Sequence, residues 1–66
     1  MYKLIKTNGE ISYQEDMTLE EMQKFVGGYI EMVGNVICNE EGRLMRLEPN
    51  EYDRNFVGNI IIKERK

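Results

Sequence analysis

Alternating polar and apolar positions near the start of the chain are typical of a half-buried β-strand. Within residues 10–14, Ile11 and Tyr13 fall on one face of such a strand, and residues 2–6 form a second run rich in strand-forming residues. Asn8-Gly9 stands between the two runs, and this dipeptide favours a two-residue type I′ turn. The pattern therefore predicts an antiparallel hairpin over residues 2–14.

The apolar spacing changes to that of a helix after residue 17. Thr18 is followed three residues later by Glu21, which is the pattern of a capping box at a helix N-terminus. Gly27 is suited to the left-handed conformation that ends many helices. One apolar stripe at helical spacing lies between these signals: Leu19, Met22, Phe25 and Val26. The sequence predicts a helix over residues 18–26.

The rest of the chain reads as short strands separated by turns. We expect strands at 29–33, 36–38 and 60–62. A further strand is expected at 43–47, as the second arm of a hairpin whose turn is at 39–42. Residues 49–55 form the longest loop. The predicted fold is a single α+β domain over residues 1–66, with one short helix packed on a mostly antiparallel sheet in the order β-β-α-β-β-β-β.

Composition supports a folded globule without a membrane span. Isoleucine, leucine, valine and phenylalanine account for 17 of the 66 residues, which is above the share of about 20% below which charged chains stay disordered. The longest uninterrupted run of these residues is Ile60-Ile61-Ile62, far short of a spanning segment. The first residues lack a basic-then-apolar pattern, so we expect no secretory leader. Cys38 is the single cysteine, so we expect a free thiol in a reducing, intracellular compartment, the cytoplasm.

Size and charge set expectations about partners. A chain of 66 residues buries only about 60% of its unfolded surface on folding, so its stability is marginal and we expect a homo-oligomer. The net charge of −3 gives no basic footprint, and we therefore expect no binding to duplex nucleic acid.

The residue types present also exclude several classes of catalytic and metal-binding site. Histidine is absent, which removes Ser-His and Cys-His catalytic arrangements and, with one cysteine, a tetrahedral zinc site. Gly27-Gly28 follows the predicted helix, whereas phosphate-binding loops precede one. The adjacent carboxylates of Glu20-Glu21 and Glu40-Glu41 are explained by helix capping and turn solubility. We therefore expect no enzyme activity, metal or cofactor.

One group of residues has side chains suited to binding a ligand. Arginines that flank a loop with amide and aromatic neighbours can clasp an anion and stack on a planar ligand. The group comprises Arg43, Arg46, Asn50, Tyr52 and Arg54. The alternative is that these side chains are solvated on an exposed hairpin.

The chain resembles a family of small uncharacterised proteins that occur largely in phages and related mobile elements. The segments that carry the resemblance are Leu19–Glu31 with its Val-Gly-Gly-Tyr-Ile-Glu core, Cys38–Leu44, Pro49-Asn50 and Val57–Ile62. The chain ends soon after Ile62, where many relatives are expected to continue. The family carries a domain of unknown function, so the resemblance implies a biological context and no established activity.

Two functions remain as expectations. The first is a non-catalytic accessory protein of a phage or mobile element that binds a host protein. The alternative is a protein that sequesters a small anionic ligand, such as a nucleotide signal used in host defence. An anion-sequestering protein should need the arginines at positions 43, 46 and 54 for its activity, whereas a host-protein binder should not.

Overall fold

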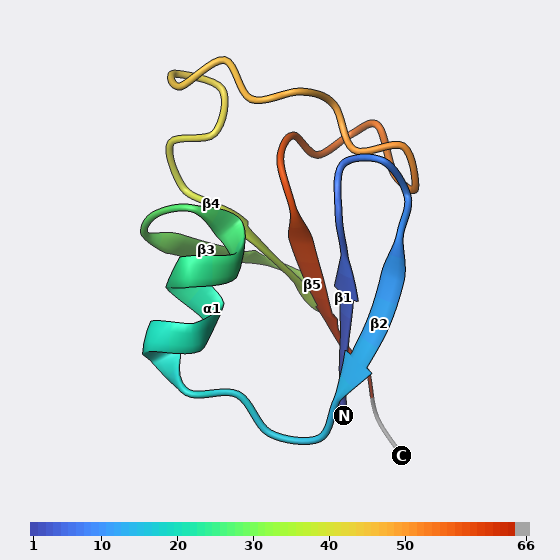
Figure 1. The fold of residues 1–66 in the computed structure, drawn as a ribbon. Helices are drawn as coiled ribbons and strands as arrows, with labels where there is room; N and C mark the ends of the chain where they lie inside the picture. The colour runs from blue at the N-terminus through green and yellow to red at the C-terminus, as the bar shows by residue number, and fades with distance from the viewer. Residues whose placement is uncertain (65–66) are drawn as a thin grey trace.

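The computed structural model describes residues 1–64, which form one helix and five strands. In chain order these are β1 (Tyr2–Ile5), β2 (Ile11–Gln14), α1 (Leu19–Val26), β3 (Ile30–Val33), β4 (Val36–Asn39) and β5 (Ile60–Lys63). The strands make a single antiparallel sheet in the spatial order β2-β1-β5-β4-β3 (Figure 1). The predicted α+β class, with one helix on an antiparallel sheet, is confirmed.

β5 occupies the middle of the sheet although it comes last in the chain. It pairs with β1 on one side, with Leu4 opposite Ile61, and with β4 on the other, with Ile37 opposite the same Ile61. Ile60 and Ile61 are fully buried. The uninterrupted apolar run at the end of the sequence is therefore explained by burial on both faces of the sheet.

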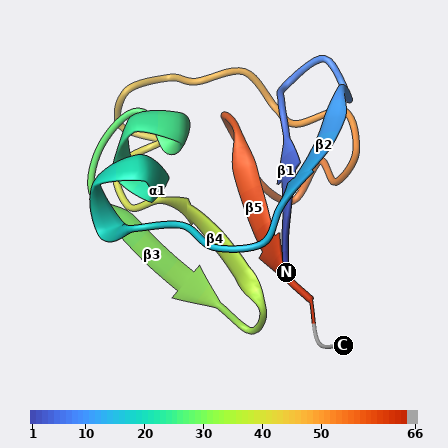
Figure 2. The ribbon, with the colours of Figure 1, turned by 60° about the horizontal axis from the view of Figure 1, so that its bottom comes forward.

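The helix covers one face of the sheet over β3, β4 and β5 (Figure 2). Alternation along each strand sends Leu4, Ile37 and Ile61 to this face, where they pack with Val26 of α1. The neighbouring residues Ile5, Cys38 and Ile60 point to the other face and form a second, smaller cluster with Phe56 at its edge. The molecule therefore has a helix-covered face and a face that only the 40–59 connection partly covers.

The predicted strand at 43–47 is wrong, and the element order is β-β-α-β-β-β. Residues 40–46 form consecutive turns, closed by bonds from the Met45 amide to the Glu41 carbonyl and from the Leu47 amide to the Gly42 carbonyl. The side chain of Asn39 accepts the Glu41 amide at 2.8 Å and starts this path. Because these backbone groups bond locally, they are not free to join a strand ladder.

The first hairpin forms as predicted over residues 2–14, but its turn is not type I′. Gly9 has a φ of +89°, whereas Asn8 has no positive φ, which a type I′ turn requires at both central positions. The Asn8 side chain accepts the Glu10 amide at 2.9 Å instead. The connection is thus a three-residue loop with Gly9 in the left-handed position, the geometry of a type I turn with a bulge.

Both helix caps are confirmed. The Thr18 hydroxyl accepts the Glu21 amide at 3.1 Å, and the Glu21 carboxylate accepts the Thr18 amide at 2.8 Å. Gly27 ends the helix with a φ of +87°. The carbonyls of Phe25 and Val26 accept the side-chain amides of Asn59 and Asn39, at 3.0 and 3.1 Å. Side chains from the 39–59 region therefore complete the C-terminal end of the helix.

Removing the N-cap hydroxyl should weaken the domain measurably. We expect Thr18→Ala to lower the free energy of unfolding by about 1 kcal/mol, because the Glu21 amide loses its acceptor. Urea denaturation measures this change. Thr18→Asp is the matched control, since aspartate also caps helices well. Equal midpoints for wild type and Thr18→Ala would contradict a stabilising cap.

Within residues 1–64 no helix has the length and apolar character needed to cross a membrane.

Candidate interaction surface

Asn50, one of the five predicted site residues, lies in the interior. Its exposed fraction is 0%, and its amide nitrogen donates to the carbonyls of Ile5, Lys6 and Gly58 at 3.2, 3.3 and 3.0 Å. Its side-chain oxygen accepts the Tyr52 amide at 2.9 Å. The nitrogen thus ties the 48–58 segment to the end of β1, and the oxygen holds the backbone within that segment.

Tyr52 is half exposed and turns toward the sheet. Its hydroxyl accepts a hydrogen bond from the Lys3 ammonium at 3.2 Å, and that nitrogen lies 4.7 Å from the ring centroid. The hydrogen bond to Tyr52 raises the pKa of Lys3. Tyr52 is thus engaged with a residue of β1 and not with the predicted arginines.

The three arginines do not converge. Arg43 donates to the Asn55 carbonyl at 3.3 Å and lines a groove on the sheet face opposite the helix. Arg54 lines a separate depression together with Glu48 and Glu51. Arg46 lines neither, and its backbone has a left-handed φ of 57°. The structure therefore does not bring the predicted residues together around one ligand-sized space.

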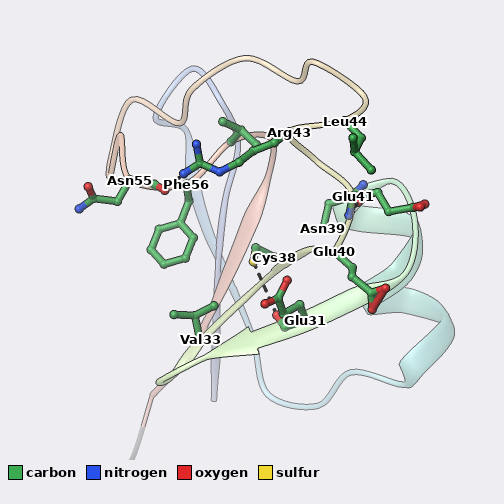
Figure 3. A pocket seen from close by; sticks show the side chains of 11 residues that line it. Glu31, Val33, Cys38, Asn39, Glu40, Glu41, Arg43, Leu44, Asn55 and Phe56 are labelled. Atoms are coloured by element: carbon green, nitrogen blue, oxygen red, sulfur yellow. Dashed lines mark hydrogen bonds between the residues drawn. The ribbon is translucent and has the colours of Figure 1, made fainter.

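Of these two depressions, the groove beside Arg43 is the more enclosed. It has a volume of about 380 Å³, and its walls come from β3, β4, the turns at 40–44 and the segment at 55–57 (Figure 3). Its lining mixes apolar and acidic side chains with one arginine: Glu31, Val33, Cys38, Asn39, Glu40, Glu41, Arg43, Leu44, Asn55, Phe56 and Val57. We call it the β3–β4 groove.

Glycine allows the two loop walls of the groove to meet. A Cβ at Gly42 would lie 2.8 Å from Cγ2 of Val57 and 3.4 Å from the Asn39 carbonyl oxygen. Gly42 is buried, and its amide donates to that carbonyl at 3.2 Å. The shape of the groove thus depends on a close approach that a larger residue would prevent.

The charges in the groove are unevenly placed. Figure 3 shows the carboxylates of Glu31 and Glu40 along the β3 side and the Arg43 guanidinium across from them, beside Phe56. Burial, and to a smaller extent the negative charge of Glu31, raises the pKa of the Cys38 thiol. Cys38 is therefore a protonated, buried side chain at neutral pH, and it is poorly suited to act as a nucleophile.

Large apolar side chains remain exposed on β3 and in segments next to it, and two of them, Val33 and Leu44, line the groove. Tyr29 is 70% exposed and Leu44 is 82% exposed. Large exposed hydrophobic side chains on β3, immediately before it and in the turns after β4 make up what we call the β3 surface: Tyr29, Met32, Val33, Leu44 and Met45. Exposed apolar side chains that line a groove on a small domain, as Val33 and Leu44 do, are typical of an interaction site.

Sequence reasoning missed Glu31, Val33 and Phe56 as site residues. A usable signal was present for the first two, since alternation places Glu31 and Val33 on the same face of the predicted strand. No signal identified Phe56, because its position depends on the path of the whole 40–59 connection. Among residues 1–64, no three aspartate, glutamate or cysteine side chains are grouped so that they could hold a metal ion.

Comparison with known proteins places the chain in a family. No curated protein and no solved structure matches it. Residues 1–65 match the model of a domain of unknown function, DUF3846. Because this match covers nearly the whole chain, the chain belongs to the DUF3846 family.

Proposed function

We propose that this chain is a non-catalytic binding protein, of the kind that phages and mobile elements encode, and that it acts on a host protein. The observation that carries the proposal is the β3 surface, whose five large apolar side chains stay exposed, with Val33 and Leu44 lining an open groove. Burying such side chains against a partner is favourable by about 25 cal/mol per Å² of apolar area. The phage context comes from the sequence resemblance.

The arrangement of charges favours a protein partner over a small anion. An anion-sequestering site needs cationic groups that point at one space, and here Arg43 and Arg54 line different depressions. The β3–β4 groove also contains three glutamates and a single arginine. A phosphate or carboxylate placed there would meet more repulsion than attraction.

Capture from host cells tests the proposal. Tagged wild type should retain a host protein, and Leu44→Asp should reduce that retention at least about tenfold because it places a charge at an apolar contact. Leu19→Asp is the matched control. Leu19 is also exposed but lies at the start of α1, outside the β3 surface, where aspartate is well tolerated. Quantitative mass spectrometry of the three samples measures the difference.

Two results would contradict the proposal. Equal retention of every host protein by Leu44→Asp and wild type would remove the β3 surface from the interaction. A native mass spectrum with a small anion bound to wild type, lost when Arg43, Arg46 and Arg54 are replaced by alanine, would establish the anion-sequestering function instead.

A further inference from the structure

β3 is an edge strand with backbone groups directed away from the sheet. Within residues 1–64 it pairs with β4 alone. The Glu40 amide donates to the Tyr29 carbonyl, so position 29 bonds toward β4. Backbone groups alternate sides along an antiparallel strand, so Glu31 and Val33 also bond toward β4. The N–H and C=O groups of Ile30 and Met32 therefore point to the open side.

The strand lacks lysine, proline and a bulge, three features that protect many edge strands. Lysine, proline or a bulge on an edge strand discourages pairing with another chain. Residues 30–33 contain neither lysine nor proline, and they keep a continuous register with β4 from Ile30 opposite Asn39 to Val33 opposite Val36. Met32 and Val33 remain about half exposed. β3 thus offers a regular template on which an additional strand can form.

The groove next to this edge determines which strand would fit. Glu31 lies between the two outward-bonding residues, so a residue of an added strand directly opposite it would place its side chain near the Glu31 carboxylate. Glu40 lines the same side of the groove (Figure 3). On the other face of β3, Met32 is exposed and Ile30 packs toward the helix. The complementary segment alternates basic and apolar residues.

We propose that β3 binds an extended basic segment of a partner protein by strand addition, with lysine or arginine side chains over Glu31 and Glu40. This inference rests on the proposed function as a protein-binding domain and specifies its partner. A second copy of this chain is a poorer occupant. The net charge of each copy is −3, and pairing two β3 strands would bring the same glutamates of both copies to one place.

A synthetic peptide tests the charge requirement directly. The probe is a capped heptapeptide in which lysine alternates with valine, and the comparison is the same peptide with glutamate for lysine. Fluorescence anisotropy should show saturable binding of the lysine peptide at low salt, weakened by added salt, and no binding of the glutamate peptide. Glu31→Lys should weaken binding of the lysine peptide by about tenfold.

Glu15→Lys is the matched control for Glu31→Lys. It makes the same change in net charge at an exposed residue of the bend after β2, outside the groove. We expect it to bind the lysine peptide within about twofold of wild type. Equal weakening by both variants would mean that the peptide responds to overall charge and would overturn the assignment to β3.

Two methylated peptides test the strand pairing itself. One carries N-methyl groups on alternate residues, and the other carries them on the remaining residues, so that each loses the donors of one strand edge. Strand addition predicts that only one of the two loses binding, with slowed amide exchange at Ile30 and Met32 in the unmodified complex. Equal binding by both methylated peptides, or unchanged exchange, would overturn the inference.

The outcomes separate this inference from the proposed function. Suppose that the lysine peptide does not bind, but that wild type retains a host protein which Leu44→Asp loses. The protein-binding function then stands, and the inference that β3 binds a basic segment is wrong. If dimers form through β3 in sedimentation experiments and compete with the peptide, a second copy is the natural occupant and the inference fails.

Discussion

Asn50→Ala is expected to lower the free energy of unfolding by about 3–5 kcal/mol, since a buried polar group left without its partner costs about 1–3 kcal/mol. The substitution removes the donor shared by the carbonyls of Ile5, Lys6 and Gly58 and the acceptor of the Tyr52 amide. A domain of this length has a total stability of roughly 3–10 kcal/mol. Much of the variant should therefore be unfolded in the absence of denaturant.

Asn55→Ala provides the control for this loss. Asn55 is exposed in the same loop, and its hydrogen bonds to Arg43 and Asp53 use the backbone carbonyl and amide, which alanine retains. Its effect should stay within about 0.5 kcal/mol. Urea denaturation followed by circular dichroism compares the two variants with wild type. Similar midpoints for all three would mean that the Asn50 contacts do not stabilise the fold.

Gly58→Ala should also destabilise the domain, by about 2–4 kcal/mol, through left-handed backbone strain and overpacking. Gly58 has a φ of +76°, and a Cβ there would lie 2.7 Å from Cδ1 of Leu47. Its amide donates to the Glu48 carbonyl and its carbonyl accepts from Asn50, so the backbone has little freedom to move away.

Gly34→Ala separates the two contributions. Gly34 also has a positive φ, +63°, but a Cβ there would meet no atom within 4 Å. This variant should lose only about 1 kcal/mol, the cost of the backbone conformation. Thermal unfolding of both variants, with Leu47→Ala added to Gly58→Ala, measures the contribution of the side-chain clash. If Gly34→Ala and Gly58→Ala lose equal stability, the contact with Leu47 is unimportant.

The parts of the fold that sequence could predict depend on neighbouring residues. The capping box of Thr18 and Glu21 and the glycine at position 27 act within a few residues, and both appear in the structure as expected. The hairpin over residues 2–14 was likewise predictable from its alternation and its glycine turn. Only the type of that turn differed, because the Asn8 side chain bonds to the Glu10 amide.

The parts that could not be predicted depend on distant contacts. Asn50 reads as a polar loop residue, and its burial follows from carbonyls of Ile5 and Lys6 more than forty positions away. Residues 43–47 have strand-like composition, yet the side chain of Asn39 begins a series of turns there. The separation of Arg43 from Arg54 likewise depends on the whole path of the 40–59 connection, which has no periodic pattern.

Several residues in the segments that carry the family resemblance have structural roles here. Gly27 ends the helix, Asn39 binds the Val26 carbonyl, Asn50 ties the loop to β1, and Gly58 allows close approach to Leu47. Their roles in packing and capping explain why the fold needs these residue types. Surface residues such as Glu31 and Leu44 are better places to look for differences in binding between relatives.

The central position of β5 also determines the order in which this molecule can assemble. The β1–β2 and β3–β4 hairpins are each local and can form early, but the sheet that unites them needs residues 60–63 between β1 and β4. Closing the chain from Tyr2 to Lys63 is the long-range step, and such steps are slow. Until it occurs, the inner edges of β1 and β4 are open, with Leu4 and Ile37 unburied. The period of greatest aggregation risk is therefore the interval before β5 inserts.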